Sequence, residues 1–291
     1  MNPAGPNVPP VFWTRGQLGR DAAVRYQDVA APWIFGPFAE ALVQLVAPRR
    51  GESVLDLGCG TGAATRPAAA AVGSTGRVIG LDLNVGMLEV ARASSASGDL
   101  DVDDDVDMAE IEWIEASAEA PPLANRSFDV VIASQSAQFP AGTAAVAGEI
   151  RRVLRPSGRL GLTAWRDPSA SPYFAAEIEA VAMRLGAEAA DGLLADFRLA
   201  DPAPLVTALA VAGVAELETR RIDLILDLPP LADWAPRHLA ATAVASALAS
   251  APGLARELGA DLAQAMADYV TPDGIRAPFS SWYIGGVAPA V

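Results

Sequence analysis

Hydrophobic and polar positions follow two different periods in the middle of the chain. Short apolar runs, typical of buried strands, are separated by segments whose apolar residues recur every three to four positions, as in helices. The predicted strands are Ser53–Leu57, Arg77–Asp82, Ile111–Glu115, Phe128–Ser134 and Arg159–Trp165, and the predicted helices between them are Ala63–Ala71, Val85–Ala93 and Ala144–Leu154. Alternating strands and helices predict βαβ units and therefore an α/β fold with a mostly parallel sheet.

The flanking segments have a more helical pattern. Asp21–Ala47 carries apolar residues at helical spacing, and Pro32 and Gly36-Pro37 predict breaks that divide it into short helices. Later segments predicted to be helical, with loops, are Asp167–Ala212 and Leu231–Val270, and the two further predicted strands are Leu217–Leu228, with antiparallel alternation, and Phe279–Val287. We therefore expect three parts: a tail and lid helices in 1–50, a ligand-binding core in 51–166, and helical cap elements with the last two strands in 167–291.

Composition narrows the classes of protein and partner. Hydrophobic residues make up 52% of the chain and charged residues 19%, which is typical of a globular protein. The net charge of -14 repels phosphate backbones and anionic lipid, so we expect no nucleic-acid or membrane partner. Cys59 is the sole cysteine, and the first ten residues lack the features of a signal peptide, so the cytoplasm is the expected compartment. We expect a monomer or homodimer. The uncharged segment Leu239–Ala255 is expected to be a buried helix.

An acidic segment, Asp99–Glu110, interrupts the pattern before the third predicted strand. A calcium-binding loop is one interpretation, but the segment lacks the central glycine and the terminal glutamate of an EF-hand. We interpret it as a solvated loop.

A glycine-rich turn lies where the first predicted strand meets the first predicted helix. Gly58, Gly60 and Gly62 alternate with other residues, so no Cβ keeps a ligand from the turn, and positive φ angles are permitted. The helix that follows presents unpaired N–H groups. Asp82 ends the next strand, where a carboxylate can accept both ribose hydroxyls of an adenosine-containing cofactor. These features predict a nucleoside pocket at the carboxyl ends of the strands.

The identity of the cofactor depends on charge. Gly58, Gly60 and Ala63 also satisfy a loose dinucleotide fingerprint, so an NAD-dependent oxidoreductase is an alternative. Asp56, however, lies inside the strand just before the glycines. A carboxylate there attracts the cationic groups of S-adenosylmethionine (SAM) and repels the phosphates of NAD. The sequence therefore favours SAM.

Four blocks of sequence carry a family resemblance between Ser53 and about Trp165. They are Leu55–Gly62, Gly80–Leu88, Ala116–Ala120 continuing through Ser127–Val131, and Glu149–Leu160. In these blocks the chain resembles class I SAM-dependent methyltransferases, in particular the branch of ubiquinone/menaquinone-type C-methyltransferases and bacterial secondary-metabolite enzymes. The resemblance implies a Rossmann-like, seven-stranded sheet with helices on both faces, and S-adenosylhomocysteine (SAH) as a product.

The resemblance also implies a set of SAM-binding residues. For the methionine moiety they are Asp56, Gly58, Gly60, Gly62, Ser134 and Gln135; for the ribose, Asp82; and for the adenine, Leu83, Met87, Ser117 and Ala118. Ser117 departs from the family, which often has an aspartate there to bind the adenine amino group.

Methyl transfer chiefly requires alignment of the acceptor and exclusion of water. A general base is needed only where the acceptor must lose a proton. The candidate catalytic residues are His238, Tyr26 and Gln138. His238 is either a surface or lid residue or a base that reaches the pocket. The sequence has no cluster with metal-ligand spacing, so we expect no metal.

Aromatic residues near the predicted pocket favour a small, largely apolar or aromatic substrate, methylated on O, C, N or S. The candidate substrate-binding residues are Trp13, Tyr26, Trp33, Gln138, Phe139 and Trp165. Two other functions stay open at this point: a protein of the same fold with non-methylating chemistry or only a binding role, and the NAD-dependent oxidoreductase.

Overall fold

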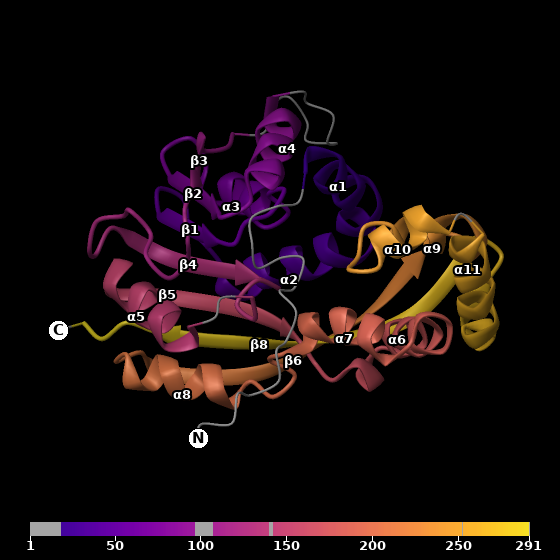
Figure 1. Ribbon diagram of the computed structural model, residues 1–291. Helices are drawn as coiled ribbons and strands as arrows, with labels where there is room; N and C mark the ends of the chain where they lie inside the picture. Colours follow the sequence, from indigo (N-terminus) through magenta and orange to yellow (C-terminus); the bar gives the residue numbers. More distant parts are fainter. Residues whose placement is uncertain (1–18, 97–106, 140–141, 252, 291) are drawn as a thin grey trace, which may run out of the picture.

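A mixed sheet forms the centre of the molecule (Figure 1). The computed structural model describes residues 19–96, 107–139, 142–251 and 253–290. Strand order is β3-β2-β1-β4-β5-β8-β6, with the short β7 paired to β8. The strands are β1 (Ser53–Leu57), β2 (Arg77–Asp82), β3 (Ile111–Glu115), β4 (Phe128–Ser134), β5 (Leu154–Trp165), β6 (Ala215–Leu228), β7 (Val270–Thr271) and β8 (Gly274–Val287). β1 to β5 pair with one another in parallel, whereas β8 pairs antiparallel with both β5 and β6, which confirms the predicted Rossmann-like class.

Helices cover both faces of the sheet because successive strand residues point to opposite sides. Val54 and Val130 belong to one buried cluster, and their chain neighbours Leu55 and Val131 belong to another. The first cluster includes residues of α2 (Gly36–Val46) and α3 (Thr65–Val72), and the second includes residues of α5 (Thr143–Val153) and α8 (Ala203–Val211). α4 (Val85–Ala96) contacts β2 and β3. Each face of the sheet therefore has its own core.

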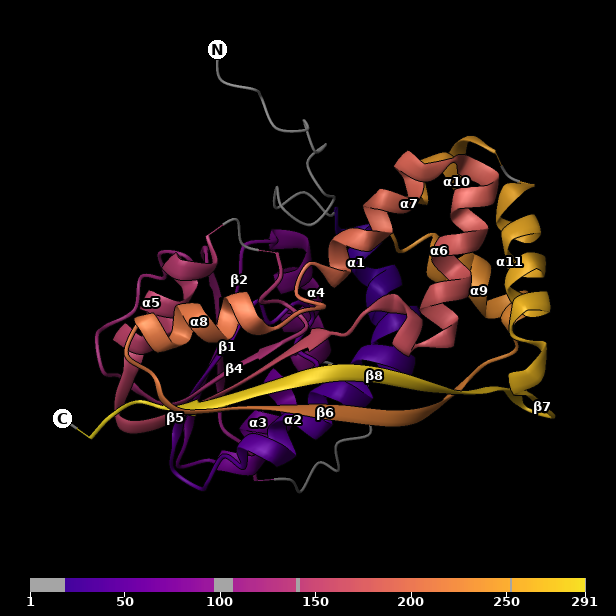
Figure 2. The same cartoon turned by 90° about the horizontal axis from the view of Figure 1, so that it is seen from below.

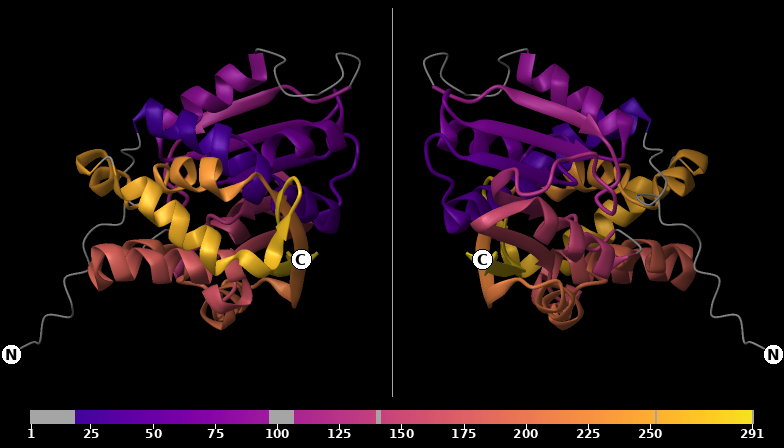
Figure 3. Two further views of the ribbon diagram at one scale, coloured as in Figure 1. Left: turned by 90° about the vertical axis from the view of Figure 1, so that its right-hand side faces the viewer. Right: turned by 90° about the vertical axis from the view of Figure 1, so that its left-hand side faces the viewer.

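The outer half of the β6–β8 pair supports a helical cap. β5 pairs with β8 over residues 281–287, whereas β6 continues to pair with it as far as Ile275, so the two long strands extend beyond β5 (Figure 2). The cap helices are α6 (Pro172–Leu185), α7 (Ala187–Leu194), α9 (Leu231–Leu239), α10 (Ala245–Ser250) and α11 (Leu254–Ala265), with short 3-10 turns η2 (Pro168–Ala170), η3 (Ala195–Phe197) and η4 (Ala267–Tyr269). The cap lies beside one end of the sheet (Figure 3).

The N-terminal helical run is continuous, so the predicted breaks at Pro32 and Gly36-Pro37 are wrong. α1 (Arg20–Arg25) leads directly into a π-helical segment, η1 (Tyr26–Phe35), and then into α2. The Gly36 N–H donates to the Ala31 carbonyl five residues back, and a Cβ on Gly36 would lie 2.9 Å from that oxygen. Pro37, which has no N–H to donate, follows Gly36 at the junction of η1 and α2. The wider π-helical turns thus accommodate Pro32 and Gly36-Pro37 without ending the helix.

The same run, Arg20–Val46, is the one helix within the described ranges that is long and apolar enough to cross a membrane by length and composition. Half of its 18-residue window is buried in the fold. A helix packed in a protein core requires similar apolar residues.

The segment Leu239–Ala255 differs from the prediction of one buried helix. α9 ends at Leu239 and α10 begins at Ala245, and among the residues between them Val244 is the buried one. The Thr242 hydroxyl donates to the Leu239 carbonyl and accepts from the Val244 N–H at 3.5 Å. This local bonding of a threonine side chain competes with the helix and forms a turn instead.

β5 begins earlier than predicted, at Leu154 rather than Arg159. Pro156-Ser157-Gly158 separates the predicted helix Ala144–Leu154 from the predicted strand, and Ser157 has a positive φ of 63°. The Ser157 N–H donates to the Ala288 carbonyl, and the Ala288 N–H donates to the Gly158 carbonyl. Pairing with the chain after β8 therefore extends the strand through Ser157 and Gly158.

Candidate active site

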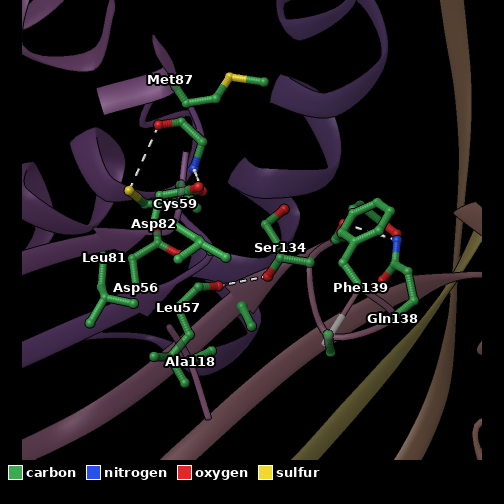
Figure 4. Close-up of a pocket in the computed structure, with 18 of the residues that line it drawn as sticks. Asp56, Leu57, Cys59, Leu81, Asp82, Met87, Ala118, Ser134, Gln138 and Phe139 are labelled. Carbon is green, nitrogen blue, oxygen red and sulfur yellow. Dashed lines mark hydrogen bonds between the residues drawn. The ribbon is translucent and has the colours of Figure 1, made fainter. Parts of the chain in front are cut away.

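A cavity of about 310 Å³ opens at the carboxyl ends of the parallel strands, the edge at which such sheets bind ligands. The loops after β1, β2, β3 and β4 form most of its wall (Figure 4). The remaining wall comes from Tyr26 and Phe35 of η1, Trp165 at the end of β5, and Asp196 of η3. The core thus supplies one side of the cavity, and the N-terminal helix and cap supply the other.

The glycine-rich turn after β1 borders this cavity. Gly58 has φ 68°, and a Cβ there would lie 2.6 Å from the Ser136 Cβ, so only glycine fits between β1 and the loop after β4. Gly60 has φ 55°, and nothing lies within 4 Å of a Cβ built on it. The turn therefore brings bare backbone to the cavity at Gly60.

Asp82 connects the turn to the loop after β2. Its Oδ2 accepts from the Gly60 N–H at 2.8 Å, and its Oδ1 accepts from the Asn84 N–H at 2.8 Å. Burial raises the pKa of Asp82, although these backbone hydrogen bonds oppose the rise. Each carboxylate oxygen retains a further lone pair for a ligand hydroxyl.

Asp56, near the end of β1, has an unpartnered oxygen. Its Oδ2 accepts from the Thr65 hydroxyl at 2.6 Å, whereas Oδ1 is buried and has no hydrogen-bond partner. Burial raises the pKa of Asp56 to about 7; Asp82 adds to the rise, and the hydrogen bond from Thr65 opposes it. A buried acceptor without a donor is costly. This cavity wall is therefore suited to a ligand that brings a cationic donor.

The loop after β4 adds two glutamines. Gln135 has a positive φ of 51°, and its Nε2 donates to the Ser281 hydroxyl at 2.8 Å. Gln138 Nε2 donates to the Gln135 carbonyl at 2.9 Å, and the Oε1 atoms of both glutamines are buried without a partner. Both side chains are therefore anchored by their amide nitrogens, with an acceptor still available.

Most of the residues selected from the sequence line this cavity. They are Tyr26, Asp56, Gly58, Gly60, Asp82, Leu83, Met87, Ser117, Ala118, Ser134, Gln135, Gln138, Phe139 and Trp165. Gly62 is not among the lining residues, because it faces the Trp113 ring and the Arg66 guanidinium. Trp33 is 40% exposed and also lies outside the cavity, so its selection as a substrate contact is wrong. Trp13 falls outside the described residues.

His238 lies in the cap core, so its interpretation as a surface residue is wrong. Its ring stacks on Trp234 at 4.7 Å between centroids, and its Nδ1 is 2.9 Å from the Tyr173 hydroxyl. Glu177 Oε1 is 3.3 Å from the same nitrogen. His238 lines a smaller cavity of about 40 Å³ and is not among the residues that line the larger one.

Sequence reasoning missed several lining residues. Phe35, Asn84, Glu119, Ser136 and Asp196 also border the larger cavity. Asn84 lies two residues after Asp82, so the loop after β2 gave a signal that could have found it. Asp196 has no such motif, because its position depends on how the cap packs against η1 and β5.

Comparison with known proteins identifies the family. A family model described as a methyltransferase domain matches residues 54–158. Nocamycin O-methyltransferase of Saccharothrix syringae is 34% identical over 212 residues, which cover 69% of this chain and 73% of the relative. The ubiquinone/menaquinone C-methyltransferase UbiE of Klebsiella pneumoniae is 33% identical over 124 residues, 43% of this chain and 47% of UbiE.

The fold has relatives among solved structures. Phosphoethanolamine N-methyltransferase 2 of Haemonchus contortus, in complex with S-adenosyl-L-methionine, superposes with a TM-score of 0.56 at 19% identity, over 96% of this chain and 59% of that one. This likeness concerns the fold, whereas the sequence matches above define the family. The chain belongs to the class I SAM-dependent methyltransferases, and it is an enzyme that methylates small metabolites.

Proposed function

We propose that this enzyme binds SAM in the larger cavity and transfers its methyl group to an oxygen of a small, largely apolar or aromatic metabolite. The observation that carries the SAM assignment is Asp56 Oδ1, a buried acceptor that awaits a cationic donor. The oxygen acceptor follows the 34% identical nocamycin O-methyltransferase. Phe35 and Trp165 give the acceptor side of the cavity an apolar, aromatic wall.

The residues of the cavity fit SAM in charge and shape. We assign the ammonium group of SAM to Asp56 and the ribose hydroxyls to Asp82, with Met87 and Leu83 against the adenine. Gly60 lets the ligand approach the backbone. SAM supplies the methyl group on a sulfonium sulfur, and the chain supplies alignment and exclusion of water. NAD fits poorly, because its phosphates would face Asp56.

Calorimetric titration with SAM, SAH and NAD tests the assignment. We expect micromolar dissociation constants for SAM and SAH, and no heat of binding for NAD. Asp82→Ala should weaken SAM binding by roughly ten- to a hundredfold, because hydrogen bonds to a charged group contribute about 1.5–3 kcal/mol each. Asp227→Ala, at an exposed carboxylate on β6 outside the cavity, is the control and should bind SAM as the wild type does. NAD binding without SAM binding would refute the proposal.

The affinity for SAM should increase with pH up to neutrality. Asp56 has a pKa of about 7 in the ligand-free protein, and a bound cation favours its ionised form, so SAM binding releases protons below that pH. The dissociation constant should fall by up to about tenfold per pH unit between pH 5.5 and 7, and level off above pH 7. Calorimetry at pH 5.5, 6.5 and 7.5 measures it. Equal affinities at all three values would contradict a carboxylate contact with the SAM cation.

The remaining features of the enzyme are also proposals. We propose a cytoplasmic monomer or homodimer with no nucleic-acid partner, supported by the net charge of -14. We assign lid helices to 1–50, the SAM-binding core to 51–166, and the cap and the final strands of the sheet to 167–291. In this assignment the cap selects the acceptor. Retained SAM affinity without SAH formation on any acceptor would instead indicate a non-methylating role.

A further inference from the structure

Asp196 occupies the boundary between the larger and the smaller cavity. Four residues line both cavities: Tyr26, Phe35, Trp165 and Asp196. Three of them are aromatic, so Asp196 contributes the one carboxyl group of this shared wall. It is carried by η3, a short turn of the cap between α7 and α8. The cap thus places an acid on the wall that the two cavities share.

The carboxyl group of Asp196 has an oxygen without a partner. Its Oδ1 is buried and forms no hydrogen bond with the described residues. The other acids of the larger cavity each bind part of the protein: Asp56 binds Thr65, Asp82 binds Gly60 and Asn84, and Glu119 binds the Gly142 N–H at 2.8 Å. Because an unpartnered buried carboxylate destabilises a protein, its presence here indicates a ligand that donates a hydrogen bond.

We propose that Asp196 is the catalytic base, the group that accepts the proton of the acceptor hydroxyl during methyl transfer. This inference rests on the proposed function. The acceptor oxygen forms a bond to the methyl carbon, and the carbon–sulfur bond breaks with its electron pair passing to sulfur. The hydroxyl proton passes to the Asp196 carboxylate. The products are the methyl ether, neutral SAH and the protonated acid, so atoms and charge balance.

The surroundings of Asp196 suit this role. Burial raises the pKa of Asp196 to about 7; Glu177 of α6 adds to the rise, and Arg198 opposes it. The other titratable groups on the walls of the two cavities near it are Tyr26 of η1 and His238 of α9. A base with a pKa near the working pH is the most effective proton acceptor. The adjoining rings of Phe35 and Trp165 favour an aromatic acceptor.

The test uses 4-nitrophenol, whose absorbance distinguishes phenol from phenolate, bound to the SAH complex of the full chain. A neighbouring carboxylate disfavours the phenolate, so the bound phenol should have a raised pKa in the wild type. Asp196→Asn should lower that pKa by about one unit or more. Asp191→Asn, at an exposed acid on the same segment of the cap, removes the same charge and should leave it unchanged. SAH affinity, measured first by calorimetry, should be retained in both variants.

Each outcome is decisive. A bound phenol with the same pKa in wild type and Asp196→Asn would overturn the role of Asp196, as would the absence of phenol binding to the wild-type SAH complex. Failure of the wild type to bind SAH would instead refute the proposed function itself. Asp196→Asn should fold, because it removes an acid whose pKa is higher in the folded than in the unfolded chain. Its stability at pH 8 should equal or exceed that of the wild type.

Discussion

Replacing Gly60 by valine should weaken SAM binding strongly while the protein remains folded. Gly60 lines the larger cavity with φ 55°, and a Cβ there would enter open space rather than the protein interior. A β-branched side chain would occupy that space, and it disfavours a positive φ by about 1–3 kcal/mol. We expect the SAM dissociation constant to rise roughly a hundredfold or more, which corresponds to about 2.7 kcal/mol. Calorimetry measures the affinity, and denaturant unfolding measures the stability.

Gly148→Val is the matched control. Gly148 lies on the exposed side of α5, also with nothing within 4 Å of an added Cβ, but it has no positive φ and is not among the cavity-lining residues. This variant should bind SAM as the wild type does. Unchanged SAM affinity in Gly60→Val would show that the ligand does not approach the turn, and would remove the basis for placing SAM in this cavity.

The features that could be predicted from the sequence are those whose requirements are local. Gly58 must adopt a positive φ, and Gly60 must donate its N–H to Asp82. These requirements fall within one strand, one turn and the next strand, so residue type and spacing reveal them. The parallel core could be predicted for the same reason, because strands and helices differ in the spacing of their hydrophobic residues, and this spacing is visible within each βαβ unit.

The cap could not be predicted to the same depth, because its important contacts join distant segments. His238 is buried because Tyr173, 65 positions earlier, bonds to its ring nitrogen, and Trp234 stacks on the ring. Neither partner forms a recognisable motif with it. Asp196 likewise borders the cavities only because η3 packs beside η1 and the end of β5. A lone histidine or aspartate in a helical segment gives no signal of such packing.

The π-helical segment determines which aromatic residues of the N-terminal run face the cavity. In a regular α-helix, residues seven apart lie on nearly the same face, so Tyr26 and Trp33 would lie together. The π-helical segment has wider turns, which shift this phase. Tyr26 and Phe35, nine apart, face the cavity instead, with ring centroids 5.1 Å apart, and Trp33 points outward. Hydrophobic period alone does not reveal a π-helix.

Trp165→Ala should cause a large loss of stability. Trp165 is 2% exposed and contacts the rings of Phe38, Phe174 and Phe35 at 4.9, 5.0 and 5.8 Å between centroids. It therefore joins the end of β5 to the N-terminal helix and to the cap. Removing a buried tryptophan typically costs about 3–5 kcal/mol, because the apolar surface is lost and the cavity left behind does not fully collapse. Urea unfolding followed by circular dichroism measures the free energy of unfolding.

Trp33→Ala is the control for this variant. Trp33 belongs to the N-terminal helical run that Trp165 contacts, but it is 40% exposed. Its loss should therefore change the free energy of unfolding by less than about 1 kcal/mol. Equal losses in the two variants would show that the Trp165 cluster does not couple the cap to the core. Trp165→Ala should also retain SAM affinity at temperatures where it is folded, because the residues assigned to SAM lie on the loops after β1, β2, β3 and β4. Stability and cofactor binding would then depend on different walls of one cavity.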